Sequence, residues 1–154
     1  MADDIHLEVD GREITLAAEA DESLLRALRA HGLTATTGAC EQGECGSCSV
    51  LLDGRLECSC LVPAMVCEGA RVATVEGQVG RDLGEALAAN GAVQCGFCTP
   101  GFVVAAEAAL DHDGPPLSVE QVRESLAGNL CRCTGYEGLI RAVCETDRAR
   151  RGIA

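Results

Sequence analysis

The chain has 154 residues, enough for one ordinary domain or two small ones, and 47% of them are hydrophobic although only two Phe, one Tyr and no Trp are present. Its net charge of −12 argues against nucleic acids and anionic lipid surfaces as partners, because both repel an acidic protein. The sequence has no basic segment leading into an apolar run and no apolar stretch of membrane-spanning length. We therefore expect a soluble, cytoplasmic protein whose 11 cysteines serve metal binding or redox chemistry rather than disulfides.

The first half of the sequence predicts two β-hairpins and one further strand. Apolar and polar residues alternate before and after two Asp-Gly pairs, which are typical of two-residue hairpin turns. The turns are expected at 10–11 and 53–54, and the strands at 5–9, 13–16, 49–52, 55–59 and 72–75. These strands predict a small sheet.

One helix is expected to cross this sheet. Asp21 is placed to cap it, and Leu24, Leu25 and Leu28 share one face. Gly32 lies where a helix ends. A glycine-rich loop follows.

That loop holds three cysteines with a characteristic spacing. Cys40, Cys45 and Cys48 form the Cys-x4-Cys-x2-Cys pattern that holds plant-type two-iron clusters together with a later fourth cysteine. Gly43 and Gly46 are free to adopt positive φ, which lets the loop wrap around a metal and point backbone N–H groups at the sulfurs. We predict a metal site here.

The spacing alone leaves the fourth ligand open. Cys58 and Cys60 are two residues apart on an expected strand and point to the same side, so either could reach the site. Whichever is left over, like Cys67 and Cys144, is expected to be a small buried hydrophobic residue.

The second half of the sequence predicts helices. Residues 76–82 are glycine-rich and polar, as in a link between two units, so we expect domains at 1–78 and 79–154. Helices are expected at 83–89, 99–110, 118–127 and 136–145. Thr99 is expected to cap the second helix with Pro100 at its first position, and Ser118 and Gln121 resemble a capping box. The apolar second helix is expected to be buried on all sides.

A second group of four cysteines precedes two of these helices. Cys95 and Cys98 lie before one, and Cys131 and Cys133 lie before another, so both helix N-termini would face the metal. Helix N-termini favour negative charge, and a cluster held by four thiolates is anionic. Structural zinc also takes four cysteines and is the alternative, although a Cys-x-Cys arm is less typical of it.

Four motifs together resemble one protein family. They are GACEQGECGSC at 38–48, SCL at 59–61, QCGFCTPGF at 94–102 and GNLCRCTGY at 128–136. In this order and spacing they resemble the small iron-sulfur subunit of the molybdenum hydroxylases. This is the xanthine dehydrogenase family, which also contains carbon monoxide dehydrogenase and bacterial oxidoreductases of N-heterocycles and aldehydes. The resemblance covers almost the whole chain.

The resemblance implies a fold and a set of site residues. It implies an α+β chain, with a plant ferredoxin-like β-grasp domain followed by an all-α four-helix domain, each holding one 2Fe-2S cluster. It identifies Cys60 as the fourth ligand of the first cluster. It also implies that Gln94 and Cys133 can hydrogen-bond to a pterin on a partner.

The implied function is electron transfer inside an oxidoreductase complex. Single electrons would pass from a molybdenum centre through the two clusters to FAD. Molybdopterin would lie on a large partner subunit and FAD on a medium one, in a heterotrimer or its dimer. We expect no catalytic residue on this chain, and its sequence does not reveal the substrate. The alternatives are a free-standing two-cluster ferredoxin and a zinc-stabilised binding module.

Overall fold

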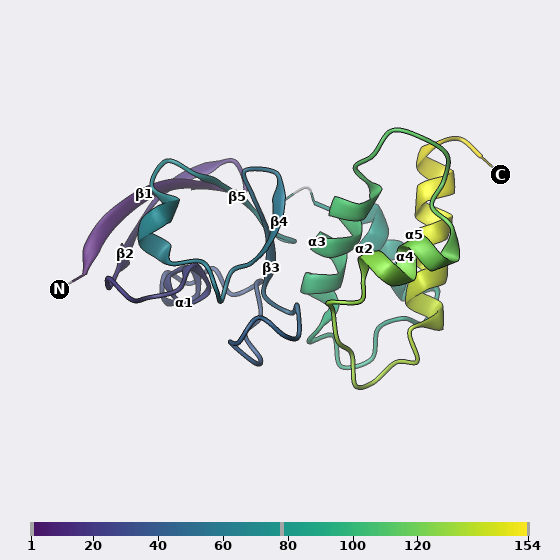
Figure 1. The fold of residues 1–154 in the computed structure, drawn as a ribbon, viewed down its shortest axis with the longest axis horizontal. Coiled ribbons are helices and arrows are strands. Elements are labelled where there is room, and N and C mark those ends of the chain that lie inside the picture. Colours follow the sequence, from purple (N-terminus) through teal and green to yellow (C-terminus); the bar gives the residue numbers. More distant parts are fainter. Residues whose placement is uncertain (1, 78, 154) are drawn as a thin grey trace.

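The computed structural model describes residues 2–77 and 79–153, with a sheet and a group of helices at opposite ends of an elongated molecule (Figure 1). The five strands lie in the order β2-β1-β5-β3-β4. They are β1 (Asp3–Val9), β2 (Arg12–Ala18), β3 (Ser49–Leu52), β4 (Arg55–Cys58) and β5 (Arg71–Ala73). Only the β1–β5 pair is parallel among these strands.

Both predicted hairpin turns are confirmed. Asp10 and Gly11 have φ values of 52° and 79°, and Asp53 and Gly54 have 49° and 80°. Two consecutive positive φ values are what a type I′ turn requires, and its twist matches that of the flanking strands. The turns therefore fix the register of β1 with β2 and of β3 with β4.

Helix α1 (Leu24–Ala30) buries Leu24 and Leu28 against the sheet, as predicted, but begins at a different cap. The cap is Ser23 rather than Asp21, because Ser23 has extended backbone angles and its side chain accepts a hydrogen bond from the Arg26 N–H at 3.4 Å. The predicted end at Gly32 is confirmed, since this residue has a φ of 93°. A short 3-10 helix at Ala64–Cys67 was not predicted.

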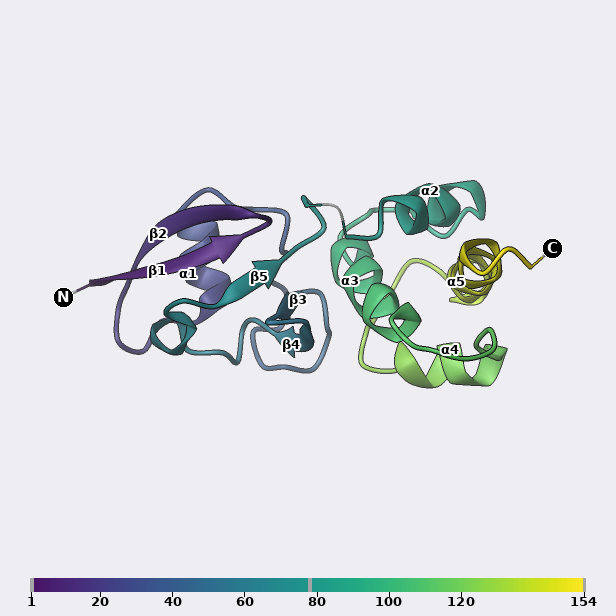
Figure 2. The same cartoon turned by 90° about the horizontal axis from the view of Figure 1, so that it is seen from above.

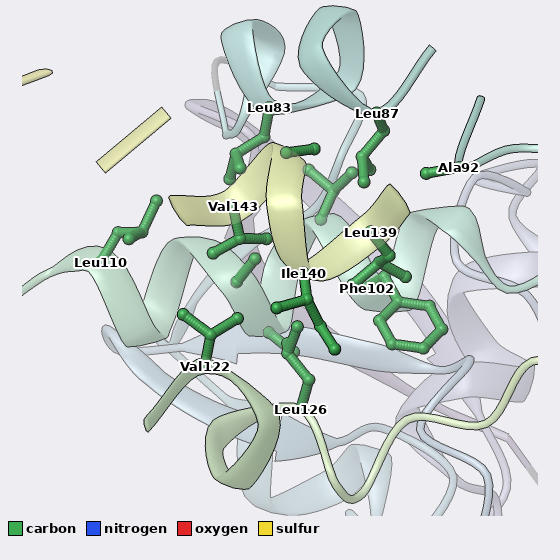
Figure 3. Close-up of a cluster of buried hydrophobic side chains, with 14 residues drawn as sticks. Leu83, Leu87, Ala92, Phe102, Leu110, Val122, Leu126, Leu139, Ile140 and Val143 are labelled. Atoms are coloured by element: carbon green, nitrogen blue, oxygen red, sulfur yellow. The ribbon is translucent and has the colours of Figure 1, made fainter. Parts of the chain in front are cut away.

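Four helices make up the other end of the molecule. They are α2 (Arg81–Ala89), α3 (Thr99–Leu110), α4 (Val119–Ser125) and α5 (Glu137–Arg150). Their common core is drawn in Figure 3, with Leu83 and Leu87 of α2, Phe102 and Leu110 of α3, Val122 of α4, and Leu139, Ile140 and Val143 of α5. The capping box of Ser118 and Gln121 is confirmed.

Helix α3 joins the two ends of the molecule. It is buried along most of its length, as predicted, because it contacts α2 and α4 on one side and β3 and β4 on the other (Figure 2). Its N-cap is Cys98 rather than Thr99, which is already the first helical residue. The residue at the start of α3 is therefore itself a predicted metal ligand, and its side chain makes no capping hydrogen bond.

The link between the two ends is short. Strand β5 ends at Ala73 and α2 begins at Arg81, two residues earlier than predicted. The predicted division between 78 and 79 involves residue 78, which lies outside the described residues. Among residues 2–77 and 79–153, no helix has the length and apolarity needed to cross a membrane.

Candidate metal centres

Two loops carry five of the eight predicted ligands, while Cys60 follows β4 and Cys95 and Cys98 precede α3. The loop between α1 and β3 carries Cys40, Cys45 and Cys48, and the loop between α4 and α5 carries Cys131 and Cys133. Both loops lie at the lower edge of Figure 1. The first turn of α3, with Cys98 as its cap, starts beside them.

The first loop has the geometry that its glycines predicted. Gly43 and Gly46 have φ values of 77° and 68°, and Glu41 adopts 51° although it carries a side chain. This winding points the Gln42 N–H at the Cys40 sulfur, at 3.4 Å. Hydrogen bonds from Gln42, then from the Cys45 thiol and the Glu44 backbone, lower the pKa of Cys40 to about 7. The loop thus favours a thiolate before any metal is considered.

The thiols of the first group lie beside one another. Cys40 lies next to Cys45, and Cys48 lies next to both Cys60 and Cys58. Burial and the neighbouring Cys48 thiol raise the pKa of Cys60 to about 12, while the Gly43 N–H acts in the opposite direction. A bound metal ion would deprotonate both thiols of a pair.

The second group is made of two pairs. The sulfurs of Cys95 and Cys133 are 3.5 Å apart, and Cys98 lies next to Cys131. Burial and the Cys131 thiol raise the pKa of Cys98 to about 12. Within this pair the pKa of Cys98 thus lies above that of Cys131.

Donors around Cys131 stabilise its thiolate. Its sulfur accepts hydrogen bonds from the Thr134 hydroxyl at 3.2 Å and from the backbone N–H groups of Thr134 and Cys133, both at 3.4 Å. Burial acts to raise the pKa of Cys131, but these bonds outweigh it and lower the pKa to about 7. The Tyr136 hydroxyl accepts the Cys131 N–H at 2.8 Å and so holds the backbone of this ligand.

The pairing of thiols fits a two-iron cluster. A 2Fe-2S cluster held by four thiolates has about two thiolates for each iron. Within the part of the chain that the structure describes, the His, Cys, Asp and Glu side chains form no group of three or more that could hold a metal ion, so the thiols meet as neighbours rather than as a closed four-ligand site. The thiols, their pairing and their N–H donors all match the ligand chemistry of an iron-sulfur cluster.

The two groups are joined by hydrogen bonds that the sequence did not predict. The Leu130 N–H donates to the Cys45 carbonyl at 2.9 Å, and the Asn129 side chain donates to the Gly46 carbonyl at 3.0 Å. Asn129 is 5% exposed, so its amide is held inside this contact. Asn129 stands two residues before a cysteine, and nothing in that position alone signals a contact to a loop more than eighty residues away.

The second group lies beside an exposed surface. Gln94, Cys95 and Cys133 are exposed, and Gln94 directly precedes the Cys95 thiol that faces Cys133. Two large apolar side chains near them, Phe97 and Leu130, are 49% and 52% exposed. This edge combines apolar and polar groups, as surfaces that bind partners do.

The remaining cysteines are arranged differently from one another. Cys67 is fully buried, as predicted for a spare cysteine, and Cys144 is half-buried on α5. Cys58 is also half-buried, but its thiol lies next to Cys48 of the first group. Cys58 is thus not a simple buried hydrophobic residue.

Comparison with protein families agrees with this chemistry. A family described as a 2Fe-2S binding domain matches residues 72–144. The xanthine dehydrogenase iron-sulfur-binding subunit of Escherichia coli O157:H7 is 40% identical over 151 residues, which cover 95% of this chain and 95% of that protein.

Solved structures share the fold. One chain in the crystal structure of quinoline 2-oxidoreductase from Pseudomonas putida 86 is 40% identical, with a TM-score of 0.87 over 99% of both chains. The aldehyde oxidoreductase from Desulfovibrio desulfuricans ATCC 27774 is 39% identical, with a TM-score of 0.89 over 97% of this chain and 17% of that one. The same fold thus occurs as a chain of this length and within a much longer one.

Proposed function

Because this chain belongs to the iron-sulfur subunits of the molybdenum hydroxylases, the xanthine dehydrogenase family, we propose that it is the electron-transfer subunit of such an oxidoreductase. Single electrons pass from a molybdenum centre on a partner, through two 2Fe-2S clusters on this chain, to FAD on another partner. The observation that carries the proposal is that cysteines far apart in the sequence have neighbouring thiols, as Cys95 and Cys133 do at 3.5 Å. When bound, each cluster supplies a site that gains and loses one electron.

The first cluster is assigned to Cys40, Cys45, Cys48 and Cys60. The Gly43 N–H at the Cys60 sulfur supports Cys60 as the fourth ligand, because N–H donors stabilise thiolates at such clusters. The sheet and α1 form the domain around this cluster, which we interpret as a plant ferredoxin-like β-grasp fold spanning 1–78.

The second cluster is assigned to Cys95, Cys98, Cys131 and Cys133 in an all-α domain spanning 79–154. Cys98 is the N-cap residue of α3, so the positive end of that helix dipole lies next to this ligand. The hydroxyl and N–H donors on Cys131 hold the negative charge that the ligand set carries.

A short connection runs from one ligand set to the other. Leu130 precedes the ligand Cys131, and its N–H donates to the carbonyl of the ligand Cys45 at 2.9 Å. The route between the two cysteines therefore consists of covalent bonds and one hydrogen bond. This connection supports electron transfer within the chain rather than by collision between molecules.

The exposed edge around the second group is assigned to the partner that carries molybdopterin. Gln94 and Cys133 are exposed beside the cluster ligands, where they can hydrogen-bond to a pterin, and Phe97 and Leu130 supply apolar contact area. The first group then lies toward a medium FAD-binding subunit. We propose a cytoplasmic heterotrimer or its dimer, and the substrate is bound by the large subunit.

The direct test is metal and spin analysis of the complex purified with its neighbouring subunits. We expect about four irons and four acid-labile sulfides per copy of this chain, and two distinguishable paramagnetic signals after reduction. A colourless chain with stoichiometric zinc would contradict the proposal.

Replacing Gln94 by Ala should leave both paramagnetic signals intact, while molybdopterin retention or turnover falls. An unchanged cofactor content and turnover would contradict the role of Gln94.

A further inference from the structure

Cys58 is a fifth thiol at the first group of cysteines. It is the last residue of β4, where it pairs with Ser49 across the hairpin. Its thiol lies next to that of Cys48 and also interacts electrostatically with Cys40 and Cys45. Of the three cysteines of the Cys-x4-Cys-x2-Cys loop, Cys48 is therefore the direct neighbour of Cys58.

Strand β4 ends at Cys58, and Cys60 lies in the turn that follows, where the Leu61 N–H donates to the Cys58 carbonyl at 2.9 Å. Between them, Ser59 is 0% exposed, and its hydroxyl donates to the Cys48 carbonyl at 2.7 Å. The Ser59 N–H donates to the same carbonyl at 3.3 Å. This anchoring fixes the strand end against Cys48, and the thiols on either side of Ser59 both lie next to the Cys48 thiol.

The surroundings of Cys58 differ from those of the other spare cysteines. Cys67 is fully buried and its thiol faces the Pro63 carbonyl at 3.8 Å, as expected of a packing residue. Cys144 lies on α5 among charged side chains. Cys58 alone of these three lies next to a thiol assigned as a cluster ligand.

We propose that Cys58 is a reserve ligand of the first cluster, able to replace Cys60 on the iron that Cys48 holds. The inference rests on the proposed assignment of a 2Fe-2S cluster to this group. In such an exchange the Cys58 thiol would give up its proton and bind iron, and the Cys60 thiolate would leave the iron and take up a proton. No electron is transferred, and the number of thiolates on the cluster is unchanged.

Cys60 remains the preferred ligand because its sulfur faces the Gly43 N–H, a donor from the loop that also carries Cys40, Cys45 and Cys48. For Cys58, burial and neighbouring thiols are the main influences on the sulfur. A cluster held by Cys58 would therefore be bound with a different set of hydrogen bonds, and its reduction potential would differ. This difference makes the exchange detectable.

The test uses alanine variants in the purified complex, since alanine cannot bind iron. Cys58→Ala should match the wild type in iron content and in both paramagnetic signals. Cys60→Ala should keep the paramagnetic signal of the first cluster (the first signal), with shifted g values and a shifted midpoint potential. The double variant that combines Cys58→Ala and Cys60→Ala should lose the first signal and about half of the iron. The signal of the second cluster should be retained and serves as a control for folding.

A matched control replaces a distant thiol. Cys60→Ala with Cys144→Ala should retain the first signal as fully as Cys60→Ala alone. The proposal is overturned if Cys60→Ala loses the first signal as completely as the double variant, or if it fails to assemble, because a reserve ligand should support assembly. Retention of the first signal in the Cys58 and Cys60 double variant also overturns it. A wild-type chain without two clusters would instead refute the proposed function.

Discussion

The sulfur of Cys131 accepts three hydrogen bonds, and the one from the Thr134 hydroxyl is the shortest at 3.2 Å. A donor stabilises the more negative, reduced cluster, so it raises the reduction potential. Thr134→Val should lower the potential of the second cluster by about 40 mV, which corresponds to about 1 kcal/mol for a one-electron couple. A redox titration followed by electron paramagnetic resonance measures this shift.

The conservative variant separates the hydroxyl from the rest of the side chain. Thr134→Ser keeps the donor and should keep the wild-type potential, and the first cluster should be unaffected in both variants. A potential for Thr134→Val equal to the wild type would show that this hydrogen bond has no electronic role.

Individual residues were predicted well where their chemistry depends on the local sequence alone. The positive φ of Gly43 and Gly46 follows from three cysteines within nine residues, and the structure confirms it. Two helix caps were wrong, at Asp21 and Thr99. A cap depends on the direction in which the chain enters the helix, and that direction is set by contacts with distant segments.

Among the elements, α3 approaches the first cysteine loop so closely that only glycine fits at the contact. A Cβ on Gly101 would lie 2.2 Å from the Gly46 carbonyl oxygen and 2.8 Å from the Ser47 Cα. Both are backbone atoms that cannot rotate away. Gly101→Ala should therefore destabilise the protein by about 1–3 kcal/mol, although alanine is the better helix former. The fall in unfolding temperature measures this effect.

Gly84 in α2 offers a matched control. A Cβ at this position has no atom within 4 Å, so Gly84→Ala should raise stability by up to about 1 kcal/mol. Opposite signs for the two glycines are the expected result. A stabilising Gly101→Ala would mean that α3 and the loop do not pack as closely as the structure has them.

The elements themselves were largely predictable, and their ends less so. The period of apolar residues predicted five strands, α1 and four further helices, all of which are present. Helix α5 runs to Arg150 rather than ending near Glu145. The extra turn is stabilised by Asp147, which is 1% exposed and accepts the Leu117 N–H at 2.7 Å. This long-range contact gives no periodic signal in the sequence.

At the scale of the whole molecule, the arrangement of the two ends could not be predicted from the sequence. The cysteine spacings predicted each group separately, but the distance between the groups depends on how α3 packs against β3 and how the two loops meet. Asn129 lies at that meeting point, where its side chain donates to the Gly46 carbonyl. The same carbonyl also accepts the Ser49 hydroxyl at 2.7 Å, so the first loop does not depend on Asn129 for its own fold.

Removing the Asn129 amide should therefore loosen the contact between the loops without removing either cluster. Loss of one hydrogen bond costs about 1 kcal/mol, which corresponds to about fivefold faster hydrogen exchange of an amide protected by that contact. The amide to monitor is that of Leu130, which donates to the Cys45 carbonyl. In Asn129→Ala, the magnetic interaction between the two reduced clusters should also become weaker and more broadly distributed.

Asn90→Ala is the control, because the Asn90 amide also joins two helices by donating to the Ala86 carbonyl at 3.1 Å and to Glu145 at 2.9 Å. This variant removes comparable hydrogen bonds far from the cysteine loops. Hydrogen exchange of the Leu130 amide and the magnetic interaction between the two clusters should therefore match the wild type. If both variants change the Leu130 amide equally, the effect reflects general stability. The separation of the clusters would then be set by the packing of α3 on β3, and Asn129 would only fill the space between the loops.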